Sequence, residues 1–224
     1  MNIISNFKFQ LNKDRVIKMV QSYGKMPQYS ELDKMYKNLL PILKDHSNPL
    51  GIFKMEEKDE SINLNMLSNC KFTIYCLITL GEKCTNKINE MFENGNFYEA
   101  LVLDSMSSNY LFNMSSQLHH IICSKASKIN LGITHKVAPG DGEIELEYQN
   151  NILSKLRDAN FHNVKMVNNC VYPHKSLTYI YGADESISVN GDDHCCSRCS
   201  NVFCNMRHIE KENNYAVEKA INCA

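Results

Sequence analysis

The chain has 224 residues, of which 43% are hydrophobic and 22% charged, and its 24 basic and 25 acidic residues give a formal net charge of −1. These values are typical of a globular protein with one domain, or one domain plus a small appendage. The balanced charge argues against nucleic acid as a partner, and no run approaches the roughly 18 apolar residues of a membrane span. Charged residues occur near the N-terminus before any long apolar run, so we expect no signal peptide and a cytoplasmic protein.

The first half of the chain predicts two helices and two strands. Residues 12–23 carry an apolar face and form the first helix. The second helix is expected to be capped by Ser30, and Pro41 is expected to kink or shorten it. GIFKM at 51–55 and the β-branched, aromatic stretch at 71–80 predict strands.

The second half begins with a helix that stops at Gly95, followed by the most regular helix of the chain. Its apolar residues recur at spacings of three and four: Leu103, Met106, Tyr110, Met114, Leu118 and Ile121. Another helix, with a face from Leu146 to Leu156, precedes strands at 164–167 and 177–182. The elements do not alternate as strand, helix, strand, which favours an α+β fold with helices packed on a mainly antiparallel sheet. We place the domain at residues 1–183 and a cysteine-rich C-terminal tail at 184–224.

The turn KVAPGDG at 136–142 contains more special residues than a simple turn requires. Pro139 fixes one φ angle, while Gly140 and Gly142 permit positive φ and a close approach of the backbone to a ligand. Exposed amides beside a helix N-terminus favour a carboxylate or phosphate, and Lys136 adds a positive charge. The acidic residues that follow would complement the helix dipole or pair with an amino group. The alternative is a capped helix start with a solvated lysine.

Several motifs resemble the activation domain of cobalamin-dependent methionine synthase. They are GIFKM, ITLGEK, ALVLDSMSSNY, KVAPGDGEIELEYQNNILSKL and VNNCVYPHKSLTYIYG, spread over about residues 12–183. The resemblance implies a domain that binds S-adenosylmethionine in a shallow groove beside an antiparallel sheet. It presents the methyl group to the cobalamin of a partner module when that cofactor has reached the inactive cob(II)alamin state. The domain contributes positioning and supplies no nucleophile.

The resemblance also implies which residues bind the ligand. Lys136 stands where the family has an arginine for the carboxylate of S-adenosylmethionine, Ala138 and Gly140 would offer backbone contacts, and Tyr181 would lie against the ligand. Lysine cannot form the bidentate contact of arginine, so the carboxylate would be held less firmly. Asp141 replaces an aromatic residue of the motif.

The long helix departs from the family too, because it has Ser108 where the family places an acid. The chain is therefore interpreted as a stand-alone reactivation module for a corrinoid methyltransferase such as methionine synthase, working with a flavodoxin-like or ferredoxin-like reductant. One alternative is a non-catalytic scaffold or cap for a corrinoid protein that no longer binds S-adenosylmethionine. Another is an electron carrier that acts through a metal cluster in the tail.

Ten cysteines occur in the chain, and four of them fall within ten residues of the tail: Cys195, Cys196, Cys199 and Cys204. In a reducing compartment such crowding favours a metal site over disulfides. The two-residue gap before Cys199 suits zinc or an iron–sulfur cluster, and free or redox-active thiols remain the third interpretation. Three others lie in apolar runs and are expected to be buried: Cys76, Cys123 and Cys170.

Two further features are given a structural interpretation. His119 and His120 are adjacent on a helix and point about 100° apart, so we expect a partly exposed histidine with a hydrogen-bonded neighbour and not a metal site. Lys175, in the turn PHKS, is expected to be solvated, with a contact to the partner as the alternative.

Overall fold

The computed structural model of the chain describes residues 1–59, 64–141, 144–187 and 209. Its centre is a five-stranded sheet in the order β1-β2-β3-β7-β4, and every neighbouring pair is antiparallel. The strands are β1 (Asn2–Ile4), β2 (Leu50–Glu57), β3 (Phe72–Thr79), β7 (Ser176–Asp184) and β4 (Gly132–Ile133). The predicted α+β fold with an antiparallel sheet is therefore confirmed.

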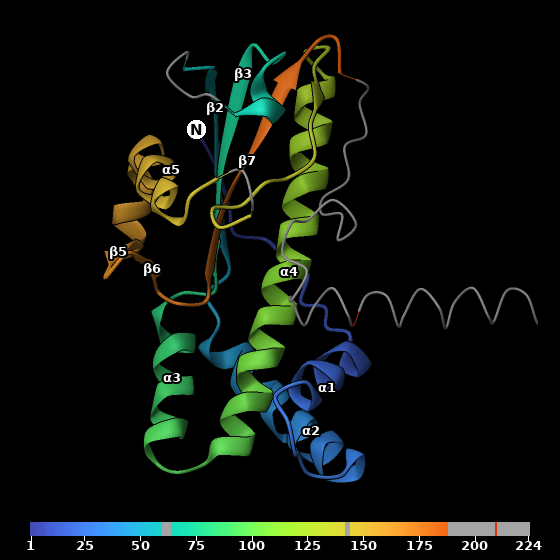
Figure 1. The fold of residues 1–224 in the computed structure, drawn as a ribbon. Coiled ribbons are helices and arrows are strands. Elements are labelled where there is room, and N and C mark those ends of the chain that lie inside the picture. The colour runs from blue at the N-terminus through green and yellow to red at the C-terminus, as the bar shows by residue number, and fades with distance from the viewer. Residues whose placement is uncertain (60–63, 142–143, 188–208, 210–224) are drawn as a thin grey trace, which may run out of the picture.

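The helices that the structure describes are α1 (Lys13–Gln21), α2 (Tyr29–His46), α3 (Glu82–Glu93), α4 (Phe97–Ser127) and α5 (Gln149–Lys155). In Figure 1, α4 and α5 lie beside the sheet, and α1, α2 and α3 lie beyond one end of it. Short 3-10 turns occur at η1 (Asn65–Leu67), η2 (Leu146–Tyr148) and η3 (Arg157–His162). None of the helices in the described ranges combines the length and apolar character that a bilayer crossing requires.

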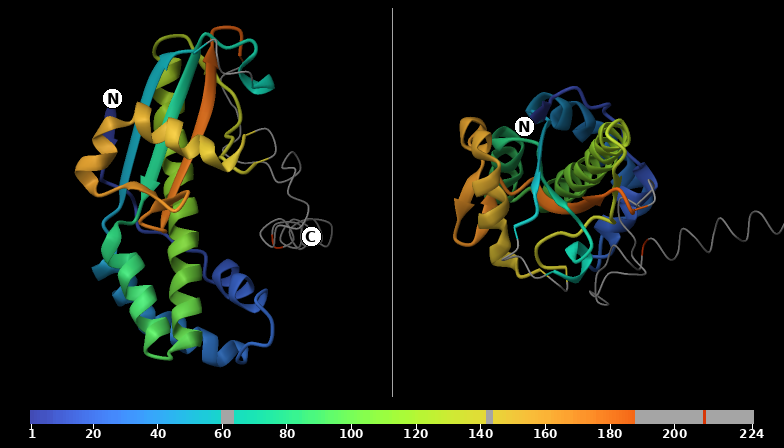
Figure 2. Two further views of the ribbon diagram at one scale, coloured as in Figure 1. Left: turned by 60° about the vertical axis from the view of Figure 1, so that its left-hand side comes forward. Right: turned by 90° about the horizontal axis from the view of Figure 1, so that it is seen from above.

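The sheet lies between α4 on one face and α5 on the other, as the left view of Figure 2 shows. Successive side chains of a strand point to opposite faces. Cys76 and Tyr181 therefore join the core under α4, whereas Leu77 and Ile180 join the core under α5. Because both faces are covered, the central strands are apolar almost throughout, which is why residues 71–80 were recognisable as a strand.

The long helix α4 buries the predicted apolar stripe. Five of its six residues are at most 2% exposed: Leu103, Met106, Tyr110, Met114 and Leu118. The sixth, Ile121, is only partly buried, and Ile122 takes the core position four residues after Leu118. The lower half of α4 packs against α1, α2 and α3, so one helix connects the helical end of the molecule with the sheet (Figure 1).

Two details of α2 differ from the sequence-based expectation. The N-cap position is Gln28, whose carbonyl accepts from the amides of Glu31 and Leu32, so the predicted cap Ser30 is wrong and lies inside the first turn. The helix also continues past Pro41 to His46. A proline removes one helical hydrogen bond, and the burial of Leu43 in the core after it offsets that loss.

The strand predicted at 164–167 does not join the main sheet. Its counterpart β5 (Lys165–Val167) pairs with β6 (Cys170–Tyr172) in a separate two-stranded hairpin. The loop is Asn168–Asn169, and both residues have positive φ angles, 49° and 60°. Asparagine tolerates this conformation, and a two-residue loop with two positive φ angles suits a tight hairpin. The strand predicted at 177–182 is β7, which lies inside the sheet between β3 and the edge strand β4.

Candidate functional site

The residues before the KVAPGDG turn run alongside β7. The amide of Thr134 donates to the carbonyl of Gly182 at 3.0 Å, and Val137 forms an antiparallel bridge with Ile180 through bonds of 3.1 and 2.9 Å. This pairing fixes which side chains turn inward. Val137 joins the core under α5, and its neighbour Lys136 therefore points toward α4.

Lys136 is buried, with 9% of its surface exposed. Its ammonium donates to the hydroxyl of Ser115 on α4 at 2.8 Å and lies 5.1 Å from the ring centroid of Tyr179 on β7. An aromatic face attracts a cation at this distance. The alternative of a solvated lysine is thus wrong, and the positive charge is held between the long helix and the sheet.

The turn itself closes through hydrogen bonds between its own residues. Asp141 accepts from the amide of Ala138 at 3.3 Å, and its own amide donates to the carbonyl of Ala138 at 2.9 Å. The amide of Gly140 donates to the carbonyl of Ile144 at 2.7 Å. Gly140 has a φ of 91°, a conformation that glycine adopts without strain. A ligand would therefore compete with Asp141 for the backbone of Ala138.

Helix does not follow the turn directly. The first helical residues are those of η2, which begins at Leu146, and α5 begins at Gln149. The expected apolar face is partly present, because Ile152 and Leu156 are buried whereas Leu146 is exposed. The turn is thus a separate loop, set before the helix and not at its first residue.

Tyr181 lies deeper than its predicted role requires. Its side chain is fully buried under α4, and its hydroxyl is 3.2 Å from Nδ1 of His119. Its ring packs edge to face on Tyr179 at a centroid distance of 5.7 Å. The structure brings Lys136, Ala138 and Gly140 together in one loop, while Tyr181 is linked to that loop through Tyr179.

Sequence reasoning missed Ser115 and Tyr179, and it did not place His119 beside Tyr181. A signal for two of them exists, because Ser115 and His119 are four residues apart on α4 and share one face. His119 is buried and hydrogen-bonded to Tyr181, whereas the adjacent His120 is exposed.

Lys175 is not solvated, contrary to expectation. Its ammonium is 2.7 Å from a carboxylate oxygen of Asp104 and donates to the hydroxyl of Ser108 at 2.9 Å. Only 12% of its side chain is exposed. Asp104 precedes Ser108 by four residues, about one helical turn. An acid is therefore present on α4 next to the position where the family resemblance implies one.

The cysteines of the described region differ in burial. Cys76 is buried as predicted, Cys123 is half-buried, and Cys170 is exposed on the hairpin, which corrects the expectation that all three are core residues. Burial raises the pKa of the Cys84 thiol above its ordinary value. No three His, Cys, Asp or Glu side chains converge as metal ligands in the part of the chain that the structure describes. The predicted ligands Cys195, Cys196, Cys199 and Cys204 lie outside it.

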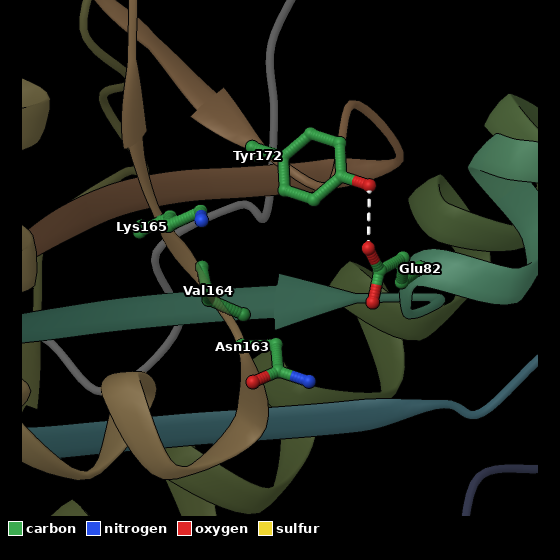
Figure 3. Close-up of a pocket in the computed structure, with 5 residues that line it drawn as sticks. All are labelled: Glu82, Asn163, Val164, Lys165 and Tyr172. Carbon is green, nitrogen blue, oxygen red and sulfur yellow. Dashed lines mark hydrogen bonds between the residues drawn. The ribbon is translucent and has the colours of Figure 1, made fainter.

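A cavity of about 290 Å³ opens between the start of α3 and the β5–β6 hairpin (Figure 3). It is lined by Glu82, Asn163, Val164, Lys165 and Tyr172. The described residues that were predicted to bind S-adenosylmethionine, Lys136, Ala138, Gly140 and Tyr181, are not among them.

Comparison with known proteins gives a match in structure and none in sequence. No protein-family model matches the chain, and no curated protein matches its sequence. Among solved structures, the chain is similar to the MetH reactivation domain, which was crystallised bound to AdoHcy. The TM-score is 0.56 with 12% sequence identity, over 80% of this chain and 77% of that one. At this identity the similarity establishes a shared fold.

Proposed function

We propose that the protein binds S-adenosylmethionine and holds it for methyl transfer to the corrinoid cofactor of a partner protein. The observation that carries the proposal is a shared fold with a domain crystallised with AdoHcy, over 80% of the chain. The loop with a buried ammonium at the edge of the same sheet adds to it.

Lys136 is the residue proposed to meet the carboxylate of the ligand. A buried ammonium gains from a charged partner because the surrounding medium weakens Coulomb interactions less than water does. Two of the groups that it contacts, the Ser115 hydroxyl and the Tyr179 ring, are uncharged. A carboxylate that reached the loop would offer a stronger, charge-assisted hydrogen bond.

The Ala138–Asp141 loop would then contact the ligand through its backbone. The amide of Ala138 already accommodates a carboxylate, that of Asp141, at 3.3 Å. A ligand carboxylate of similar shape could replace it. The contribution of these residues to methyl transfer is orientation of the donor toward the partner, an effect that can lower a barrier by several kcal/mol without any protein nucleophile.

A non-catalytic scaffold is the second candidate, and the same loop favours it. Asp141 is hydrogen-bonded to both the amide and the carbonyl of Ala138, and the ammonium of Lys136 donates a hydrogen bond to Ser115. The polar groups of this loop are thus already hydrogen-bonded to other residues of the chain. A ligand binds to them only by replacing these hydrogen bonds with its own. The scaffold would keep the fold and its docking role with no methyl donor bound.

Calorimetric titration of the full, anaerobically purified chain with S-adenosylmethionine separates the two. The first proposal predicts a dissociation constant in the tens of micromolar, roughly −6 kcal/mol. Lys136→Ala should weaken binding tenfold or more, because a charge-assisted hydrogen bond contributes about 1.5–3 kcal/mol. Lys128→Ala, which removes an exposed lysine just after α4, is the matched control and should bind like the wild type.

The outcomes assign the function as follows. An absence of binding at millimolar S-adenosylmethionine would contradict the first proposal and favour the scaffold. Binding that survives Lys136→Ala unchanged would keep the ligand but remove Lys136 from its site.

A further inference from the structure

The cavity between α3 and the β5–β6 hairpin has two opposite charges on its wall. Glu82 begins α3, and Lys165 begins β5, so the two come from distant parts of the chain. Figure 3 shows them on opposite sides of the opening, with Tyr172 and Asn163 on the two remaining sides. Val164, which is fully buried, lies between Lys165 and Asn163.

Among the residues that the structure describes, the carboxylate of Glu82 is held through one of its two oxygens. The hydroxyl of Tyr172 donates to Oε1 of Glu82 at 2.8 Å, and this bond raises the pKa of Tyr172 above its ordinary value. The ring of His174 packs edge to face on Tyr172 at 5.8 Å and supports it from the hairpin. Within the described residues, no bond is found for Oε2 of Glu82, which is therefore available to a donor.

Lys165 supplies the complementary charge. Among the residues that the structure describes, its ammonium has no carboxylate within ion-pair distance. Asn163, with a φ of 58°, turns the chain into the hairpin, and the amide of Val164 is fixed by a 3.1 Å bond to the carbonyl of Ala159. The backbone that carries Lys165 is thus anchored on η3.

We propose that this cavity binds a small zwitterion of the α-amino acid class. Its ammonium would contact Oε2 of Glu82 and its carboxylate would contact Lys165. A purely anionic ligand would meet the charge of Glu82, and a purely cationic one that of Lys165, so a molecule with both charges fits the wall best. A volume of about 290 Å³ is at the lower end of ligand pockets and suits a metabolite of amino-acid size.

This site is separate from the one proposed for S-adenosylmethionine, and the two can fail independently. Both charged residues of the wall, Glu82 and Lys165, are exposed, and an ion pair at an exposed position contributes little. We therefore expect a dissociation constant near 1 mM, which is within reach of NMR titration. L-Alanine added to the full, ¹⁵N-labelled chain should shift the amide signals of Asn163, Val164 and Lys165.

Two fragments of the probe test the zwitterion directly. Propionate carries the carboxylate alone and ethylamine the ammonium alone, and each should bind at least threefold more weakly than alanine. Propionate or ethylamine binding as tightly as alanine would overturn the proposal, as would the absence of any shift at 50 mM alanine, about fifty times the expected constant.

Variants of the two charged residues distinguish a direct loss of ligand binding from a loss caused by misfolding. Glu82→Gln and Lys165→Gln should each lower the affinity about three- to fivefold, whereas Glu93→Gln, at the exposed end of α3, should not. The double variant Glu82→Lys with Lys165→Glu exchanges the two charges and should restore binding, because the zwitterion can reverse its orientation. Affinity that is unchanged in both single variants, or that stays lost in the charge exchange, would contradict the assignment.

Discussion

The ammonium of Lys175 lies 2.7 Å from a carboxylate oxygen of Asp104 and joins the turn before β7 to the long helix α4. The same turn is tied to β3, because the amide of Leu80 donates to the carbonyl of Lys175 at 2.9 Å. The side chains of Lys175 and Asp104 are 12% and 29% exposed. One residue thus holds a helix and two strands together at the point where the sheet meets the helical end of the molecule.

Each substitution at this ion pair leaves one charge behind, and the loss should be larger when that charge is the lysine, whose side chain is the more buried of the two. Among the described residues, Asp104→Ala leaves the mostly buried ammonium of Lys175 with the hydroxyl of Ser108, and we expect it to lower the free energy of unfolding by about 2–3 kcal/mol. Lys175→Met keeps the buried stem and should cost about 1 kcal/mol. Urea denaturation measures both, and a larger loss for Lys175→Met than for Asp104→Ala would contradict the explanation.

Gly182 on β7 leaves no room for a side chain. A Cβ atom there would lie 2.4 Å from Sγ of Cys70 and 2.9 Å from Cδ2 of Leu67. Gly182→Ala should therefore destabilise the protein by about 1–3 kcal/mol through overpacking. Adding Cys70→Ala should recover part of that loss, which a double-mutant cycle in chemical denaturation detects.

Gly95→Ala is the control for this cycle. Its φ is 78° and nothing lies within 4 Å of the added Cβ, so its cost of about 1–2 kcal/mol comes from backbone strain alone. Cys70→Ala should not reduce it. Equal rescue of both glycine variants would mean that the contact with Cys70 is not the cause.

The end of β7 should make stability depend on acid pH. The backbone amide of Ser186, followed by its hydroxyl, donates to Asp184 at 2.9 and 2.8 Å and holds the pKa of that carboxyl below its ordinary value. A lowered pKa in the folded state stabilises the fold above the unfolded pKa of about 3.9. That contribution is lost as the pH falls through the lower, folded value.

Asp184→Asn removes this titration and keeps an oxygen acceptor. The difference in unfolding free energy between wild type and variant should be constant from pH 6 to 8 and should shrink below about pH 4. Thermal unfolding across that range provides the measurement. A difference that grows toward acid pH would show that the pKa of Asp184 is not lowered in the fold.

Asp141 should act as an internal competitor of the proposed ligand. Asp141→Ala frees the amide of Ala138, so S-adenosylmethionine should bind several-fold more tightly than to the wild type. Asp141→Asn keeps a side-chain oxygen that can accept from that amide in place of Oδ2, and it should bind like the wild type. Calorimetry on the two variants checks this, and weaker binding in Asp141→Ala together with an intact fold would show that Asp141 supports the ligand instead.

Local sequence patterns predicted the regular elements correctly where one interaction dominates. The spacing in α4 from Leu103 to Leu118 needs only a helix with one buried face, and β3 needs only a stretch that is apolar on both sides. The separate hairpin was not predicted, because residues 164–167 resemble a sheet strand in composition. Its marker was the Asn168–Asn169 loop, whose positive φ angles permit a tight turn.

The sequence by itself determined the α+β class, the order of the main helices and strands, and the loop of Lys136, Ala138 and Gly140 as a candidate site. These follow from periodicity, turn chemistry and motif resemblance, which are local properties of the chain. Only the tertiary structure decided what surrounds them. It buried Lys136 against Ser115 and Lys175 against Asp104, and it brought Glu82 opposite Lys165. Such pairs join residues far apart in the chain, and their burial depends on how α4 and the hairpin pack on the sheet, which no local pattern encodes.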